Sequence, residues 1–179
     1  MRKVLFLLSH LSEADLDWLM SAGSKCELVP GSVLIEKGKQ IDTLYLVLDG
    51  TLEISGVDIG DKPIRLGSGE VVGEISLLDS RPPTATVSAY GDAVVLAIPH
   101  ERLTHKLEGD AGFASRFYRS LATLLAHRLR RTYRNLGYGV DEPMDEDAEY
   151  EDELSPEILD TVHLTGTRFN RALRRKLSE

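Results

Sequence analysis

The sequence contains a single cysteine, Cys26. It therefore cannot form a disulfide within the chain, and its position in a strand-like run predicts a buried thiol rather than a nucleophile. No apolar run reaches the length of a membrane span. The apolar run at residues 4–8 is shorter than the core of a secretion signal, and no small-residue cleavage site follows it. These absences predict a soluble, cytoplasmic protein that does not interact with membranes.

The usual signatures of catalysis are also missing. The chain has no Gly-x-Ser-x-Gly elbow, no phosphate-binding Walker loop and no cluster of cysteine and histidine with metal-ligand spacing. Its five histidines are scattered, and we expect each to be an ordinary surface or core residue. The sequence therefore predicts a non-enzymatic protein with no metal site and no cofactor.

Acidic charge is concentrated in one segment. Residues 141–153 contain nine acidic residues and no basic residue, whereas the whole chain has a net charge of −8. Such a block is typical of a disordered, solvated linker. Ser155 and Pro156 then indicate a helix start before a basic C-terminus. We divide the chain into a folded domain at residues 1–136, an acidic linker at 137–153 and a short basic helical tail at 154–179.

The folded domain alternates between two hydrophobic periods. Ser12 and Asp15 resemble a capping box, and the helix that they begin should end near Gly23. Short strands bounded by glycine or proline follow as far as residue 98, and a helical period returns at residues 111–136. The predicted fold class is α+β: an antiparallel β-roll, or jelly-roll barrel, with an N-terminal helix, an inserted short helix and a long C-terminal helix.

Residues 73–87, GEISLLDSRPPTATV, have the features of an anion site. Gly73 lets the backbone approach a ligand, and the amides of Glu74, Ile75 and Ser76 would be the unpaired donors of a helix start. A carboxylate at Glu74 repels a phosphate but can accept hydrogen bonds from a sugar hydroxyl. The pattern therefore indicates a ribose beside a phosphate.

This stretch resembles the phosphate-binding cassette of the cyclic nucleotide-binding domain, the family that includes cAMP-receptor-like regulators. The family pattern is G-E-[LI]-[AS]-L, then R-[AST]-A-T-V, and residues 33–54 are similar to its β-roll signature. The resemblance implies a regulatory domain in signal transduction that binds cAMP or cGMP, with the Leu124 region closing over the base. The implied ligand-binding residues are Gly73, Glu74, Ile75, Ser76, Arg81, Thr84, Ala85, Thr86 and Leu124.

One position departs from the family pattern. The arginine expected on the cyclic phosphate is replaced by Pro83, and the nearest arginine is Arg81. Two hypotheses follow. In the first, the protein is a cyclic nucleotide sensor, which the Gly73-Glu74 pair favours. In the second, it is a degenerate member that binds no nucleotide and acts as a protein-interaction module, which Pro83 favours.

The long helix also bears on assembly. Its apolar residues recur every four positions from Phe113 to Tyr133, which indicates a buried face but not what covers it. The helix either packs on its own barrel or pairs two subunits, and we expect a homodimer through residues 111–136. Too few residues follow for the winged helix of related transcription factors, so we expect a stand-alone member without a DNA-binding domain, with an unknown protein partner.

Overall fold

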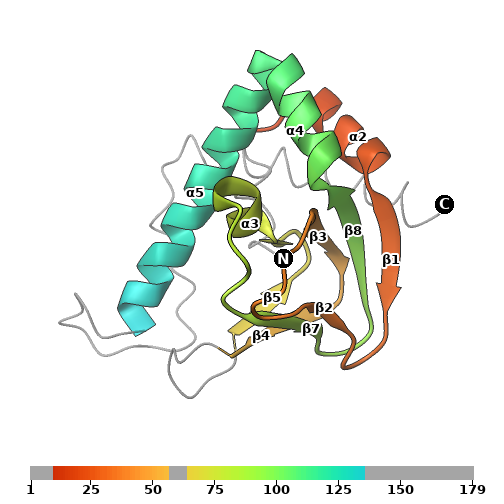
Figure 1. The fold of residues 1–179 in the computed structure, drawn as a ribbon, viewed down its shortest axis with the longest axis vertical. Helices are drawn as coiled ribbons and strands as arrows, with labels where there is room; N and C mark the ends of the chain where they lie inside the picture. The colour runs from red at the N-terminus through yellow and green to blue at the C-terminus, as the bar shows by residue number, and fades with distance from the viewer. Residues whose placement is uncertain (1–9, 57–63, 136–179) are drawn as a thin grey trace.

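The computed structural model describes residues 10–56 and 64–135, drawn in colour in Figure 1. The predicted acidic linker and basic tail lie outside the described residues. The elements are α2 (Glu13–Ala22), β1 (Ser24–Leu28), β2 (Val33–Ile35), β3 (Thr43–Asp49), β4 (Thr51–Ser55), β5 (Ile64–Gly67), β6 (Val71–Val72), α3 (Glu74–Asp79), β7 (Thr86–Ala89), β8 (Ala93–Pro99), α4 (His100–Gly109) and α5 (Ala111–Asn135).

The N-terminal helix starts as the sequence predicts. The Asp15 amide donates to Ser12 Oγ at 3.2 Å, and the Ser12 amide donates to Asp15 Oδ2 at 2.8 Å. This reciprocal pair is a capping box with aspartate in place of glutamate, and it satisfies two amides that the first turn leaves free. The helix ends at Ala22, and Gly23 is its C-cap.

The strands form two antiparallel four-stranded sheets, which confirms the predicted α+β roll. The strand orders are β1-β8-β3-β6 and β2-β7-β4-β5. Buried residues from both sheets, among them Val47, Val95, Leu52 and Val87, share one apolar core. Cys26 lies on β1 and is only partly buried, so the prediction of a buried thiol holds in part.

Strand β3 shows why its sequence is almost continuously apolar. Leu44, Leu46 and Leu48 pack in a core with the helices, whereas Val47 packs in the core between the sheets. Because alternate side chains of a strand point to opposite faces, both faces of β3 are covered. It pairs with β8 over most of its length, with Leu46 opposite Leu96.

Three helices cover one end of the sheets, as Figure 1 shows for α2, α4 and the start of α5. Leu103 and Leu107 of α4 are buried with Phe113 and Phe117 of α5, and Phe113 also meets Trp18 edge-on at 5.2 Å between ring centroids. The second half of α5 then extends past α3 (Figure 1). None of the described helices combines the length and apolar character that a membrane span requires.

Candidate functional site

The short helix α3 follows β6 directly, and Gly73 makes the junction. Gly73 has a φ of 90°, in the left-handed region. A Cβ atom there would lie 2.6 Å from the backbone oxygen of Thr43. Both facts require glycine at this position. The Leu77 amide donates to the Gly73 carbonyl at 3.2 Å, so the amides of residues 74–76 precede the first hydrogen bond of the helix.

Two polar side chains of α3 are buried. Ser76 is buried, and its hydroxyl donates to the Arg81 carbonyl at 2.8 Å, which joins the helix to the loop that leaves it. Glu74 is also buried, with a relative exposure of 4%. A carboxylate this deeply covered requires a cation or several donors.

Arg128 of α5 is the partner of Glu74. Its Nη1 donates to Glu74 Oε1, and its Nη2 donates to the backbone oxygen of Val71 at 2.5 Å. The same Nη2 lies 3.6 Å from Glu70 Oε2. One guanidinium group from the end of α5 therefore contacts two buried carboxylates and a backbone carbonyl beside the start of α3.

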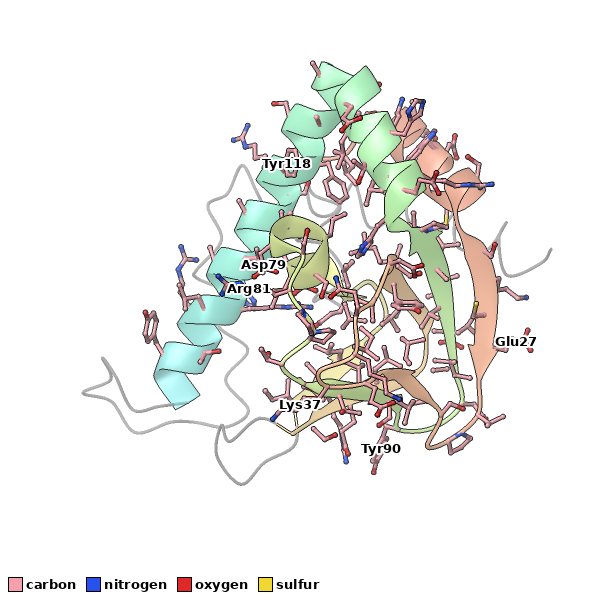
Figure 2. All side chains as sticks on the ribbon, in the orientation of Figure 1. Glu27, Lys37, Asp79, Arg81, Tyr90 and Tyr118 are labelled. Carbon is pink, nitrogen blue, oxygen red and sulfur yellow. The ribbon has the colours of Figure 1, made fainter. Side chains whose placement is uncertain are left out.

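The loop after α3 does not bring an arginine to this place. The side chain of Arg81 is 83% exposed and lies 3.8 Å from Asp79, measured from Nε to Oδ2. Figure 2 shows these two residues together beside α3. Pro83 stands at the position of the family arginine, and its carbonyl accepts from the Gly38 amide at 2.8 Å. Arg81 therefore pairs outside the site with its own neighbour.

Residues 25–110 match the family model described as the cyclic nucleotide-binding domain. This match covers the two sheets, α3 and its glycine junction. Residues 25–110 belong to the cyclic nucleotide-binding domain family. The fold and the motif thus agree on the family that the sequence resembles.

Curated relatives support the same assignment. The chain is 30% identical over 93 residues to a putative potassium channel protein of Rhodopseudomonas palustris, which covers 51% of this chain and 23% of that protein. It is 32% identical over 82 residues to the cAMP-dependent protein kinase type II regulatory subunit of Drosophila melanogaster, covering 44% and 22%. The similarity thus spans about a quarter of each relative's length.

Solved structures resemble the domain over a larger part of the chain. The catabolite activator protein of Thermus thermophilus aligns with a TM-score of 0.60 and 28% identity, covering 74% of this chain and 62% of that one. The N-terminal domain of a transcriptional regulator from Streptomyces coelicolor aligns with a TM-score of 0.58 and 29% identity, covering 74% and 96%. Both alignments extend beyond the residues that the family model matches.

The other predicted site residues of the cyclic nucleotide-binding domain have different surroundings. Ile75 and Thr84 are exposed, and Ala85 and Thr86 are partly buried. The hydroxyl of Thr86 accepts from the Lys37 amide at 3.1 Å. Leu124 is 4% exposed and packs in the core that the helices share with the sheet. Contact between these residues and a ligand remains a prediction.

Arg128 is the residue of this domain that sequence reasoning missed. The sequence places it with Arg130, Arg131 and Arg134 at the end of the long helix, where cations favour the helix dipole. The sequence nevertheless contains a signal that Arg128 faces the core. Arg128 follows Leu124 by four positions and Leu121 by seven, so it lies on the buried face of an amphipathic helix. A cation on that face requires a buried acceptor.

Proposed function

We propose that this domain is a regulatory module that accepts a cyclic nucleotide, cAMP or cGMP, beside α3. The Gly73-Glu74 junction, with its buried carboxylate, is the observation that carries the proposal. The amides of residues 74–76 suit a phosphate, and the Glu74 carboxylate suits a sugar hydroxyl. Relatives named as a cAMP-dependent kinase regulatory subunit and a cyclic nucleotide-gated potassium channel of Rhizobium etli support this ligand class.

The same geometry predicts weak binding. A phosphate that enters the site loses water, and backbone amides restore only part of that interaction. The charged partner at position 83 is missing, and Arg81 points to solvent. A buried charge-assisted partner typically contributes about 2–5 kcal/mol, so affinity should fall by roughly 30- to several-thousand-fold without it.

Calorimetric titration of the whole chain with cAMP, cGMP and a cyclic dinucleotide tests the proposal. We expect saturable binding of cAMP or cGMP with one site per chain, and no binding of the bulkier dinucleotide. Glu36→Gln, which removes an exposed charge on another loop, is the control and should titrate like the unmodified chain. If neither mononucleotide binds at about millimolar concentration, the proposal is rejected. A Kd of about 1 mM corresponds to a binding free energy of about −4 kcal/mol.

A second candidate is a nucleotide-free interaction module. Its support is specific. Arg128 already forms a hydrogen-bonded ion pair with Glu74, and Arg81 pairs with Asp79 outside the site. In that case the carboxylate pair serves only to hold α5 against the sheets. The titration distinguishes the two candidates, because only the first requires binding of a mononucleotide.

A further inference from the structure

We propose that His100 makes phosphate binding depend on protons: its imidazolium polarises the peptide group between Gly73 and Glu74, and the amide of that group then binds an anion more strongly. The proposal rests on the proposed function, because it takes the amides of residues 74–76 as the donors to the cyclic phosphate. His100 itself does not touch the ligand. It acts through the backbone of Gly73 and is therefore a positioning residue.

Three segments of the chain meet behind the start of α3. Thr43 of β3 lies opposite Pro99 of β8, and His100 follows Pro99 directly. The His100 amide donates to the Asp42 carbonyl at 2.7 Å, which fixes the first residue of α4 beside the start of β3. The Thr43 carbonyl in turn packs against Gly73, where a Cβ atom would lie 2.6 Å from it. His100 is therefore held close to the glycine junction.

The imidazole ring of His100 has hydrogen-bonding capacity that the fold does not use. Its Nε2 atom is buried and has no hydrogen-bond partner among the described residues. Burial lowers the pKa of His100, because it disfavours the charged form of the ring. Three neighbouring groups oppose that shift: the carboxylate of Asp42 and the backbone carbonyls of Gly73 and Thr43. The ring is therefore mostly neutral at pH 7, and a proton that it gains at lower pH is favoured by these acceptors.

The charged groups around the ring set the sign of the effect. Asp42 acts on it from the start of β3. Strands β6 and β8 contain no charged residue. On α3, Glu74 is paired with Arg128, and on α4 the adjacent Glu101 is exposed. A proton on His100 therefore adds positive charge beside the proposed phosphate subsite, from which the family arginine is missing.

The peptide group at the start of α3 carries the effect to the ligand side. The carbonyl of Gly73 and the amide of Glu74 belong to one trans peptide group, so they point in opposite directions. The Gly73 carbonyl already accepts from the Leu77 amide at 3.2 Å, and its second lone pair can accept a further donor. A donor or a positive charge at a carbonyl polarises the peptide group and makes its N–H a stronger donor. The Glu74 amide should therefore bind an anion more tightly when His100 is protonated.

Proton binding and ligand binding are then linked. If a proton on His100 strengthens phosphate binding, a bound phosphate must raise the pKa of His100 by the same factor. We expect saturating cAMP or cGMP to raise that pKa by about 0.5, which corresponds to a roughly threefold change in affinity. A phosphodiester stays ionised throughout the range in which histidine titrates, so the charge of the ligand itself does not change.

Nuclear magnetic resonance of the whole chain measures both steps. Titration of the imidazole signals gives the pKa of each histidine with and without saturating cAMP or cGMP, and the signal lost in His100→Gln assigns the resonance. His105, at an exposed position of the same helix, is the internal control and should keep its pKa when the ligand binds. In the ligand-free protein, the amide nitrogen signal of Glu74 should shift as His100 titrates. This shift should persist in His105→Gln and disappear in His100→Gln.

The outcomes distinguish the proton linkage from the proposed function. If a mononucleotide binds and the pKa of His100 rises no more than that of His105, the linkage is overturned and the proposed function stands. If neither mononucleotide binds, the proposed function fails and the linkage fails with it. A Glu74 amide signal that does not follow the titration of His100 also overturns the linkage. If His100→Gln does not fold, as judged by circular dichroism, His100→Asn assigns the resonance and the same criteria apply.

Discussion

At position 83 a proline stands where the family pattern has an arginine, and the structure offers no replacement in the same loop. The Pro83 carbonyl is held by the Gly38 amide, and the proline rings at 82 and 83 restrict the backbone between Arg81 and the site. Arg81 could compensate only by abandoning Asp79 and crossing this rigid pair. The proposed phosphate subsite therefore lacks a positive side chain from its own loop.

Restoring the arginine should strengthen nucleotide binding. We expect Pro83→Arg to raise the affinity for cAMP or cGMP by at least about tenfold, because it returns a charge-assisted partner to the phosphate. Pro82→Arg places the same charge one residue earlier, at an exposed position, and should have a much smaller effect. Arg81→Ala should leave the affinity unchanged, and a marked loss on titration would show that Arg81 reaches the ligand after all.

Between elements, an ion pair joins the first described helix to the last. Arg116 of α5 donates from Nε to Asp15 Oδ2 at 2.6 Å and from Nη2 to Asp15 Oδ1 at 2.8 Å. Asp15 is buried and also belongs to the capping box of α2. These hydrogen bonds, first of all those from Arg116, lower the pKa of Asp15 to about 2. The pair therefore stabilises the fold wherever Asp15 is ionised.

The pH dependence follows from the sign of that shift. The folded pKa lies below the unfolded value, so the stabilisation is complete above about pH 5, where Asp15 is ionised in both states, and is lost as the pH falls towards 2. We expect Asp15→Asn to lower the free energy of unfolding by about 2 kcal/mol at pH 7. Urea titrations at pH 7 and near pH 2.5 should show the difference between the two proteins shrink.

Glu36→Gln is the control for this measurement. Glu36 pairs with Lys39 at the surface, where such pairs contribute about 0–1 kcal/mol, so its removal should be nearly neutral at both pH values. If Asp15→Asn loses as much stability near pH 2.5 as at pH 7, ionisation of Asp15 is not what stabilises the pair.

The elements differ in how far the sequence predicted them. Turn residues and alternating periods predicted the strands well, because Asp49-Gly50 and Pro30-Gly31 mark sharp chain reversals. The sequence pattern does not predict helix α4, because a proline at position 99 is typical of a strand end. Pro99 is also the N-cap of α4, whose buried Leu103 and Leu107 lie four positions apart. Ten residues with two buried positions give too short a pattern to identify a helix.

The candidate site could be predicted only in part, because its residues come from positions far apart in the sequence. Gly73 and Glu74 could be predicted because they are adjacent in the chain and belong to a short motif, which a single sequence is enough to identify. Arg128 lies 54 positions from Glu74, and no periodicity says which acceptor a helix face will meet. Pairings of this kind depend on how α5 packs against the sheets, which the sequence pattern alone does not determine.

For the whole molecule, assembly through α5 remains a proposal, and the structure changes where the contact would lie. Leu121 is 1% exposed and packs in the core of its own chain, so it cannot form an intersubunit seam as the apolar stripe suggested. Leu129 and Tyr133, further along α5, are 53% and 51% exposed. We propose that a second copy of the chain covers these two residues.

Light scattering at high micromolar concentration tests this dimer. Leu129→Asp should weaken association by about tenfold or more, because a charge would be buried without a partner. Leu78→Asp is the matched control: it changes an exposed leucine on α3 and should leave the dimer intact. A monomer mass for the unmodified chain would contradict the proposal.

Gly73 has a consequence for the evolution of this fold. The glycine is required by its φ of 90° and by the Thr43 carbonyl, whether or not a nucleotide is present. Ser76 is likewise engaged with the Arg81 carbonyl. A lineage that lost its ligand would therefore still be under selection to keep both Gly73 and Ser76. Within the motif, an arginine at position 83 is what would record selection for the nucleotide, because Glu74 also has a structural partner in Arg128.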